Sequence, residues 1–334
     1  MKNDERRITS SDVARVAGVS RATVSAYLNN TRNISTKLQA KIKAAIDELG
    51  YTPHYFARAL KAKDTKTIGL IIPVLSNFYM PMLNSINKTA HENHYGFILS
   101  SSEEDPLREK QMLEIMLSKR VSGILIVPTA DTNKEFLKAV DSNAAPIIQV
   151  NRRLEGLLID AVTSNNFEAT YKATMHLIEK GRKNIALIGY ETSTFSSDDK
   201  KEGYKAAMKY SDLIPAIFTT SEHGVDLVAA SFRSFIDSNP AIDGLICTTP
   251  TRTTAVLKVL KEKSIKIPEE VAVIGSDDSP WTDLLEVPLT VIYEKTFEMG
   301  KVAVELLIEK IKAGNKNFSK SLILEDEFVV RKST

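Results

Sequence analysis

Apolar residues in the first fifty positions recur every three or four residues, which is the spacing of amphipathic helices. This periodicity predicts three short helices, over residues 11–18, 21–29 and 36–49. The residues expected on their apolar faces are Val13, Val16, Ala17, Val24, Leu38, Ile42, Ala45, Ile46 and Leu49. Ser20 and Ser35 stand at N-cap positions, and Gly18 and Gly50 end the first and third helices. The first two helices and their three-residue turn form a predicted helix-turn-helix.

Beyond residue 65, short apolar runs alternate with amphipathic stretches. The runs predict strands that begin near residues 67, 95, 121 and 146, and again near 184, 215, 242 and 271. Spacings of 25 to 31 residues within each group correspond to one strand, one crossover helix and their loops. Runs such as 68–72 and 271–274 are apolar throughout, which is typical of parallel strands covered on both faces. The pattern predicts two open, doubly wound parallel α/β sheets.

The overall composition narrows the class of protein. A length of 334 residues indicates two or three domains. The single cysteine, Cys247, cannot form an internal disulfide, and this excludes cysteine-built zinc and iron–sulfur sites. The first nine residues are polar and no apolar run approaches about 18 residues, so we expect no secretion signal, no membrane association and a cytoplasmic location.

Charge is distributed unevenly along the chain. Residues 1–64 contain 12 Lys/Arg and 6 Asp/Glu, whereas the remaining 270 residues contain 32 and 36. A basic N-terminal segment on a slightly acidic remainder indicates a polyanion partner for that segment, because neutralising phosphates releases counterions from nucleic acid. A solvated basic surface is the alternative interpretation of the same count.

Signals for an enzyme are weak. The chain has no glycine-rich dinucleotide fingerprint, no phosphate-binding loop and no His-Glu zinc motif, and its five histidines are scattered. We therefore expect no enzyme, no cofactor and no metal site. A two-lobed solute-binding protein is a further alternative, which the basic N-terminal segment and the absence of an export signal disfavour.

Candidate binding residues follow the predicted strands, because ligands of open parallel sheets bind beyond the carboxyl ends of the strands. Polar groups converge there between aromatic side chains, which suits a small polyhydroxylated or heterocyclic ligand. The candidates are Phe78, Tyr79, Ser101, Asn151, Tyr190, Thr249 and Asp277, and Trp281 lies just past the last of them.

Several segments carry a resemblance to a known family. Residues 12–25, Asp12-Val-Ala-Arg-Val-Ala-Gly-Val-Ser-Arg-Ala-Thr-Val-Ser25, and residues 44–53 closely resemble the headpiece of LacI/GalR-family transcription regulators. The resemblance continues through residues 57–60, 67–73, 120–125, 176–181, 267–271 and 329–333. It implies an α/β protein with an N-terminal three-helix helix-turn-helix headpiece, a hinge helix and a two-lobed, periplasmic-binding-protein-like body.

The resemblance also implies domain boundaries. Residues 1–52 form the expected DNA-binding headpiece, residues 53–65 the hinge helix, and residues 66–334 the effector-binding and dimerisation domain. Within that domain we expect an N-lobe of about 66–163 and 293–320 and a C-lobe of about 164–292 and 321–334. The last apolar run, residues 323–330, is expected to form one strand.

By this resemblance, Arg21 and Ala22 occupy the main base-reading positions, with Ala26 one turn further on. Arg21 suits a bidentate contact to guanine O6 and N7, whereas alanine at position 26 cannot make the bond of the arginine that the family commonly has there. Further DNA contacts are expected from Thr9, Ser20, Thr23, Ser25, Asn29, His54, Ala57 and Leu60. The hydroxyl groups among these have an equally plausible role as helix caps. Leu60 corresponds to a leucine that wedges between base pairs in the minor groove.

In the cleft, the family implies an effector site in which Asn151 replaces a frequent aspartate and Lys200 replaces an arginine. Asp277 keeps the usual carboxylate, and Thr249-Pro250 stand where Asn-Asp is usual. Trp281 either stacks on a ligand or packs in its loop.

The function that follows is an effector-controlled repressor of carbohydrate-utilisation genes. It binds double-stranded palindromic operator DNA as a homodimer, and its effector is a sugar or sugar phosphate. Because the chain ends at Thr334 soon after the last strand, we expect no additional heptad segment for tetramers. A regulator controlled by a phosphorylated carrier protein is the alternative.

Overall fold

The computed structural model describes residues 8–29, 32–51, 65–191, 194–222, 224–314 and 320–334. The chain divides into two compact units, Met1–Thr65 and Lys66–Thr334. Each unit has its own hydrophobic core. None of the helices within these described ranges has the length and apolar character needed to cross a membrane.

The first unit contains three helices, α1 (Ser10–Ala17), α2 (Arg21–Asn29) and α3 (Thr36–Leu49). Gly18 and Gly50 end α1 and α3 in left-handed conformation, with φ of 65° and 58°. The core consists of Val13, Ala14, Ala17, Val24, Ile42, Ala45 and Tyr51. The predicted apolar face of α1 is wrong in one position, because Val16 is 39% exposed while Ala14 is buried. The core contacts of α1 therefore follow Val13, Ala14 and Ala17.

The first lobe of the second unit contains a six-stranded parallel sheet in the order β11-β5-β4-β3-β1-β2. Its strands are β1 (Thr67–Ile72), β2 (Gly96–Ser101), β3 (Gly123–Ile126), β4 (Ile147–Val150), β5 (Ala161–Ser164) and β11 (Ser321–Leu324). Helices α5 (Met80–Glu92) and α12 (Thr296–Lys312) pack on one face of this sheet. Helices α6 (Pro106–Ser118) and α7 (Lys134–Asn143) cover the other.

The second lobe repeats this plan with the order β12-β10-β9-β8-β6-β7, in which only β12 is antiparallel. Its strands are β6 (Ile185–Tyr190), β7 (Ala216–Thr220), β8 (Gly244–Cys247), β9 (Ala272–Ser276), β10 (Thr290–Tyr293) and β12 (Glu327–Val329). The two faces are covered by α10 (Val225–Ser238) with α11 (Pro250–Glu262), and by α8 (Asn166–Glu179) with α9 (Phe195–Tyr210). The predicted fold class is confirmed.

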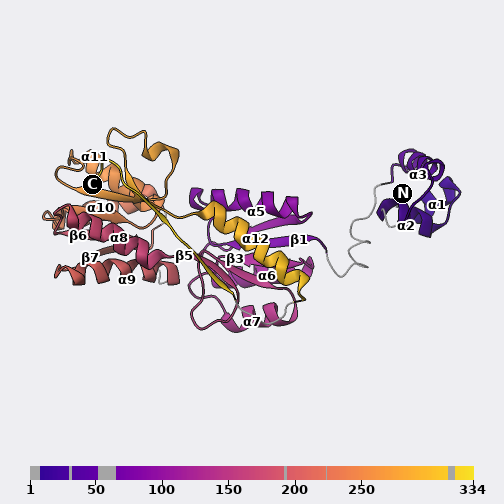
Figure 1. The fold of residues 1–334 in the computed structure, drawn as a ribbon, viewed down its shortest axis with the longest axis horizontal. Helices are drawn as coiled ribbons and strands as arrows, with labels where there is room; N and C mark the ends of the chain where they lie inside the picture. Colours follow the sequence, from indigo (N-terminus) through magenta and orange to yellow (C-terminus); the bar gives the residue numbers. More distant parts are fainter. Residues whose placement is uncertain (1–7, 30–31, 52–64, 192–193, 223, 315–319) are drawn as a thin grey trace, which may run out of the picture. The chain divides into compact units, whose positions relative to one another are not determined.

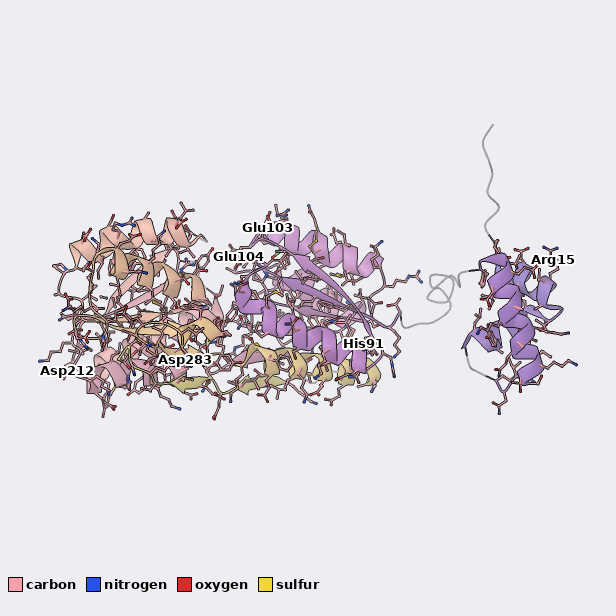
Figure 2. All side chains as sticks on the ribbon, turned by 90° about the horizontal axis from the view of Figure 1, so that it is seen from above. Arg15, His91, Glu103, Glu104, Asp212 and Asp283 are labelled. Carbon is pink, nitrogen blue, oxygen red and sulfur yellow. The ribbon has the colours of Figure 1, made fainter. Side chains whose placement is uncertain are left out.

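The chain passes between the lobes three times: from β5 to α8, from β10 to α12, and from β11 to β12 (Figure 1). The expected assignment of residues 321–334 to the C-lobe is wrong for residues 321–324, because they pair with β5 in the first sheet. The run 323–330 is accordingly two strands rather than one, separated by Glu325 and Asp326. Charged side chains such as Asp212 and Asp283 project from the surface of the second lobe (Figure 2).

Candidate functional site

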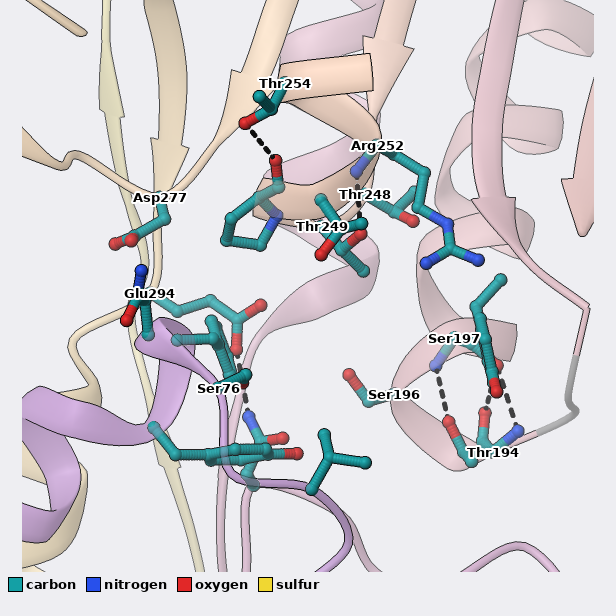
Figure 3. A pocket seen from close by; sticks show the side chains of 18 of the residues that line it. Ser76, Thr194, Ser196, Ser197, Thr248, Thr249, Arg252, Thr254, Asp277 and Glu294 are labelled. Atoms are coloured by element: carbon teal, nitrogen blue, oxygen red, sulfur yellow. Dashed lines mark hydrogen bonds between the residues drawn. The ribbon is translucent and has the colours of Figure 1, made fainter. Parts of the chain in front are cut away.

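A cavity of about 560 Å³ lies in the second unit, where carboxyl ends of strands from both sheets meet. The first lobe contributes the segment from Val74 to Tyr79 and the residues that follow β4. The second lobe contributes the ends of β6, β8 and β9 and the first turns of α9 and α11 (Figure 3). This volume and the mixed polar and aromatic lining suit a small molecule.

Most of the predicted effector-binding residues line this cavity. They are Phe78, Tyr79, Asn151, Tyr190, Lys200, Thr249, Asp277 and Trp281. Ser101 is not among the lining residues, and its hydroxyl donates to the carbonyl oxygen of Pro73 at 3.2 Å. The structure thus brings together residues that are up to 203 positions apart, from Phe78 to Trp281, although their contact with an effector stays a prediction.

Glu294 accepts polar contacts from both lobes, and no sequence pattern indicated it as a site residue. It is 3% exposed and lies in the second passage between the lobes. Its carboxylate accepts hydrogen bonds from Asn151 Nδ2 at 3.0 Å and Lys200 Nζ at 2.5 Å. Because Asn151 follows β4 and Lys200 belongs to α9, Glu294 connects the two lobes at the floor of the cavity. The positive charge of Lys200 is therefore balanced within the protein.

A second ion pair, also missed, joins Arg152 and Glu104. The guanidinium donates from Nη1 and Nη2 to the two carboxylate oxygens at 3.0 and 2.9 Å, in the bidentate geometry that arginine favours. Both residues line the cavity. Nearby, burial raises the pKa of Tyr79 to about 12.

Three lining residues adopt left-handed backbone conformations: Glu104, Asn151 and Asp277, with φ of 57°, 63° and 72°. Non-glycine residues rarely adopt positive φ, and asparagine and aspartate tolerate it best. The sharp turns that end β4 and β9 direct Asn151 and Asp277 into the cavity. Such conformations concentrate at binding sites, where the surrounding fold stabilises them.

Asp277 offers an acceptor for ligand hydroxyl groups. It accepts a hydrogen bond from the Ser279 hydroxyl at 3.0 Å, and it forms no ion pair with a described residue. Burial raises the pKa of Asp277. Trp281, from the short helix Pro280–Thr282, also lines the cavity and is 38% exposed. A carboxylate and a partly exposed indole in one lining suit a polyhydroxylated ring.

The Thr249-Pro250 pair, which departs from the family pattern, has a local structural role. Thr249 is the N-cap of α11, and its side-chain hydroxyl accepts a hydrogen bond from the backbone N–H of Arg252 at 3.4 Å. Pro250 is the first residue of the helix. A backbone N–H at this position would have no acceptor within the helix, so proline costs no hydrogen bond there. These two residues therefore begin α11 at the edge of the cavity.

Asp326 lies in the third passage between the lobes, and its burial is expected to make the stability of the fold depend on pH. Both of its carboxylate oxygens are buried without a hydrogen-bond partner in the described part of the chain. Burial, reinforced by the charge of Glu294, raises the pKa of Asp326 from 3.8 to about 7. The folded state favours the protonated carboxyl, so ionisation of Asp326 lowers the stability of the fold. This loss of stability is absent below about pH 4, grows as the pH rises toward 7 and is constant above that.

We expect Asp326→Asn to increase the free energy of unfolding at pH 8 by on the order of 2 kcal/mol, and far less at pH 4.

Urea denaturation at the two pH values measures this effect. Asp131→Asn is the matched control, because Asp131 is exposed in the loop after β3. An equal gain at both pH values, or the same gain in both variants, would contradict the assignment to the buried carboxyl.

In the first unit, α2 buries Val24 and exposes Arg21, Ala22 and Ser25, while Ala26 is half-buried. The Ser20 side chain accepts from Thr23 N–H at 3.1 Å, and the two hydroxyls lie 2.8 Å apart. Thr9 precedes α1, and its hydroxyl donates to Asp12 at 2.7 Å. These hydroxyls therefore act in helix caps and also lie at the surface or close to it. His54, Ala57, Leu60 and the side chain of Asn29 lie outside the described residues.

Comparisons with known proteins identify the family. Residues 9–54 match the model of bacterial regulatory proteins, lacI family, and residues 174–334 match a periplasmic binding protein-like domain. The ribose operon repressor of Escherichia coli is 30% identical over 308 residues, which cover 91% of this chain and 93% of that protein. The chain belongs to the LacI family.

Two further similarities extend along nearly the whole chain. The HTH-type transcriptional regulator RegA of Clostridium saccharobutylicum is 29% identical over 327 residues, covering 97% of this chain and 98% of the relative. The fold matches the lac repressor dimer bound to operator and an anti-inducer, with a TM-score of 0.87 over 98% of this chain and 99% of that chain at 21% identity. The LacI-family resemblance deduced from the sequence is confirmed.

Proposed function

We propose that this LacI-family protein is a non-enzymatic, effector-controlled repressor that binds a palindromic operator in the cytoplasm as a homodimer. The observation that carries the proposal is a cavity lined by both lobes, with Glu294 of the second passage between them in its lining. A ligand held there contacts both lobes and favours one lobe arrangement by its differential affinity for the two states. Residues 1–52 bind DNA in this proposal, and the hinge segment 53–65 transmits the change.

A carbohydrate is the effector class that the lining favours. Hydroxyl-bearing, carboxylate and aromatic side chains alternate around the cavity, and one relative is named a ribose operon repressor. A volume of about 560 Å³ supports a small molecule over a phosphorylated carrier protein as the effector. The helix-turn-helix family match supports a regulator over a solute-binding protein.

Arg21→Ala tests the DNA-binding part of the proposal. Arg21 is exposed at the first position of α2, where a recognition helix presents its N-terminal residues to base edges. Loss of one bidentate arginine–guanine contact is expected to weaken operator binding by about 1–3 kcal/mol, or roughly 5- to 150-fold. Fluorescence anisotropy with fragments of the source genome, at several salt concentrations, measures the change.

Arg15→Ala is the matched control, because Arg15 is also exposed in the first unit but belongs to α1 (Figure 2). It removes the same charge without removing the predicted base contact, so we expect a smaller loss that is similar for specific and non-specific DNA. Equal losses for both variants would argue against base reading by Arg21. Absence of salt-sensitive binding to any fragment would contradict the proposed function.

A further inference from the structure

One side of the cavity, between the first turns of α9 and α11, has an unusual charge environment. We call it the Arg252 subsite and define it by Ser196, Ser197, Thr249, Thr251 and Arg252, all of which line the cavity. Figure 3 shows Arg252 and Ser197 on the opposite side of the cavity from Asp277.

Arg252 is a buried cation without a carboxylate partner. It is 3% exposed, and no described carboxylate lies within 4.0 Å of its guanidinium. Nη2 donates to the carbonyl oxygens of Thr220 and Glu222 at 2.7 and 2.8 Å, and Nε donates to Gly189 O at 3.4 Å. The guanidinium lies 4.7 Å from the centroid of the Tyr190 ring.

The other two cations of the cavity differ from Arg252. Arg152 is paired with Glu104 and Lys200 with Glu294, so each of them has an anionic partner within the protein. Carbonyl oxygens accept three hydrogen bonds from Arg252 but carry no full negative charge. Glu222 contributes a favourable charge interaction without forming an ion pair, so the buried guanidinium lacks a directly bound anion. Consistent with this, burial lowers the pKa of Arg252.

The neighbouring helices add to the positive potential. Both α9 and α11 begin at this side of the cavity, and the N-terminus of a helix carries about half a positive charge. Ser196, in the first turn of α9, is 8% exposed, and its hydroxyl makes no hydrogen bond with another described residue. The Ser196 hydroxyl and the positive ends of two helices, beside a buried arginine, form an environment that favours an anion.

The opposite side of the cavity has the reverse character. There Asp277 provides a carboxylate acceptor. A single ligand that satisfies both sides needs anionic oxygens at one end and hydroxyl donors at the other.

We propose that the effector is an anionic carbohydrate, a monophosphorylated sugar or a sugar acid, whose phosphate or carboxylate binds at the Arg252 subsite. This inference rests on the proposed function of the cavity. The hydroxyl groups of the carbohydrate donate to Asp277, and its anionic group supplies the counter-charge that Arg252 lacks. The neutral parent sugar makes the first contact without the second and binds more weakly.

Calorimetry on the full chain tests the inference with pentose and hexose monophosphates, their parent sugars, the corresponding sugar acids and inorganic phosphate. At least one anionic sugar should bind about tenfold or more tightly than its parent. Arg252→Met should weaken binding of that ligand at least about tenfold more than binding of its parent sugar, and Arg252→Lys should have an intermediate effect because lysine lacks the planar fork. Inorganic phosphate should compete with the anionic sugar for the unsubstituted protein but not for the Arg252→Met variant.

Thermal denaturation checks that each variant is folded. If Arg252→Met does not fold, Arg252→Lys and Ser196→Ala provide the same comparison, since both preserve the size of the site. Equal affinity for anionic sugars and their parents, or unchanged anionic affinity in the folded variants, overturns the Arg252 subsite and leaves the effector cavity standing. No binding by any panel member overturns this inference. If no member alters operator binding either, the proposed carbohydrate control fails with it.

Discussion

Replacing Glu294 with glutamine should lower the free energy of unfolding of the unit Lys66–Thr334 by about 3–5 kcal/mol. The carboxylate accepts from Lys200 and Asn151 at the floor of the cavity, and the Lys200 side chain is only 13% exposed. Glutamine preserves the size of the side chain but removes the carboxylate that forms the ion pair with the buried ammonium group. The cost is therefore that of an uncompensated buried charge rather than that of a cavity.

A double variant separates this cause from simple loss of packing. Lys200→Met removes the cation, so adding it to Glu294→Gln should recover most of the lost stability. Urea denaturation followed by the fluorescence of Trp281, the single tryptophan of the chain, reports on this unit. If the double variant is as unstable as the sum of the single variants, the ion pair is not the cause.

Gly203→Ala should destabilise the second lobe by about 3 kcal/mol. Gly203 belongs to α9, and an added Cβ would lie 2.2 Å from the carbonyl oxygen of Phe167 in α8. Alanine favours a helix over glycine by about 1 kcal/mol, but the contact is with backbone, so α8 and α9 must separate to relieve it. The steric effect therefore exceeds the gain in helix propensity.

The control for this substitution is Gly189→Ala in β6 of the same lobe. There an added Cβ would meet Thr219 and Thr248 atoms at 3.6 Å, which is an ordinary contact distance. We expect a change in the midpoint of thermal denaturation for Gly203→Ala and almost none for Gly189→Ala. Similar changes in both would mean that backbone entropy, rather than the contact between α8 and α9, determines the effect.

Local patterns predicted much of the fold. The three N-terminal helices have caps, glycine stops and apolar periodicity within a few residues of one another, so their bounds follow from the sequence. Eight strands follow from continuous apolar runs. β5 and β10 were missed because each has only four residues and contains threonine, so neither gives a long apolar run. The split between β11 and β12 depends on which sheet each strand joins, and tertiary pairing decides that.

Part of the candidate site was predictable because its side chains end a strand or directly follow one. Asn151, Tyr190 and Asp277 satisfy that rule and line the cavity. Glu294 and Glu104 also follow strands closely, but nothing in their sequence context shows that they pair with Lys200 and Arg152 from distant segments. Arg252 resembles an ordinary surface residue of an amphipathic helix, and only the packing of α11 reveals that it is buried.

The positive φ of Asn151 and Asp277 restricts how this protein can acquire a new specificity. Asparagine, aspartate and glycine adopt this conformation at the lowest cost, whereas β-branched side chains at these two positions would strain the turns that end β4 and β9. A mutant library for altered ligand choice should therefore favour those three amino acids at both positions and omit β-branched ones. Diversity belongs instead at helical positions such as Ser196 and Thr251, where a new side chain leaves the backbone geometry intact.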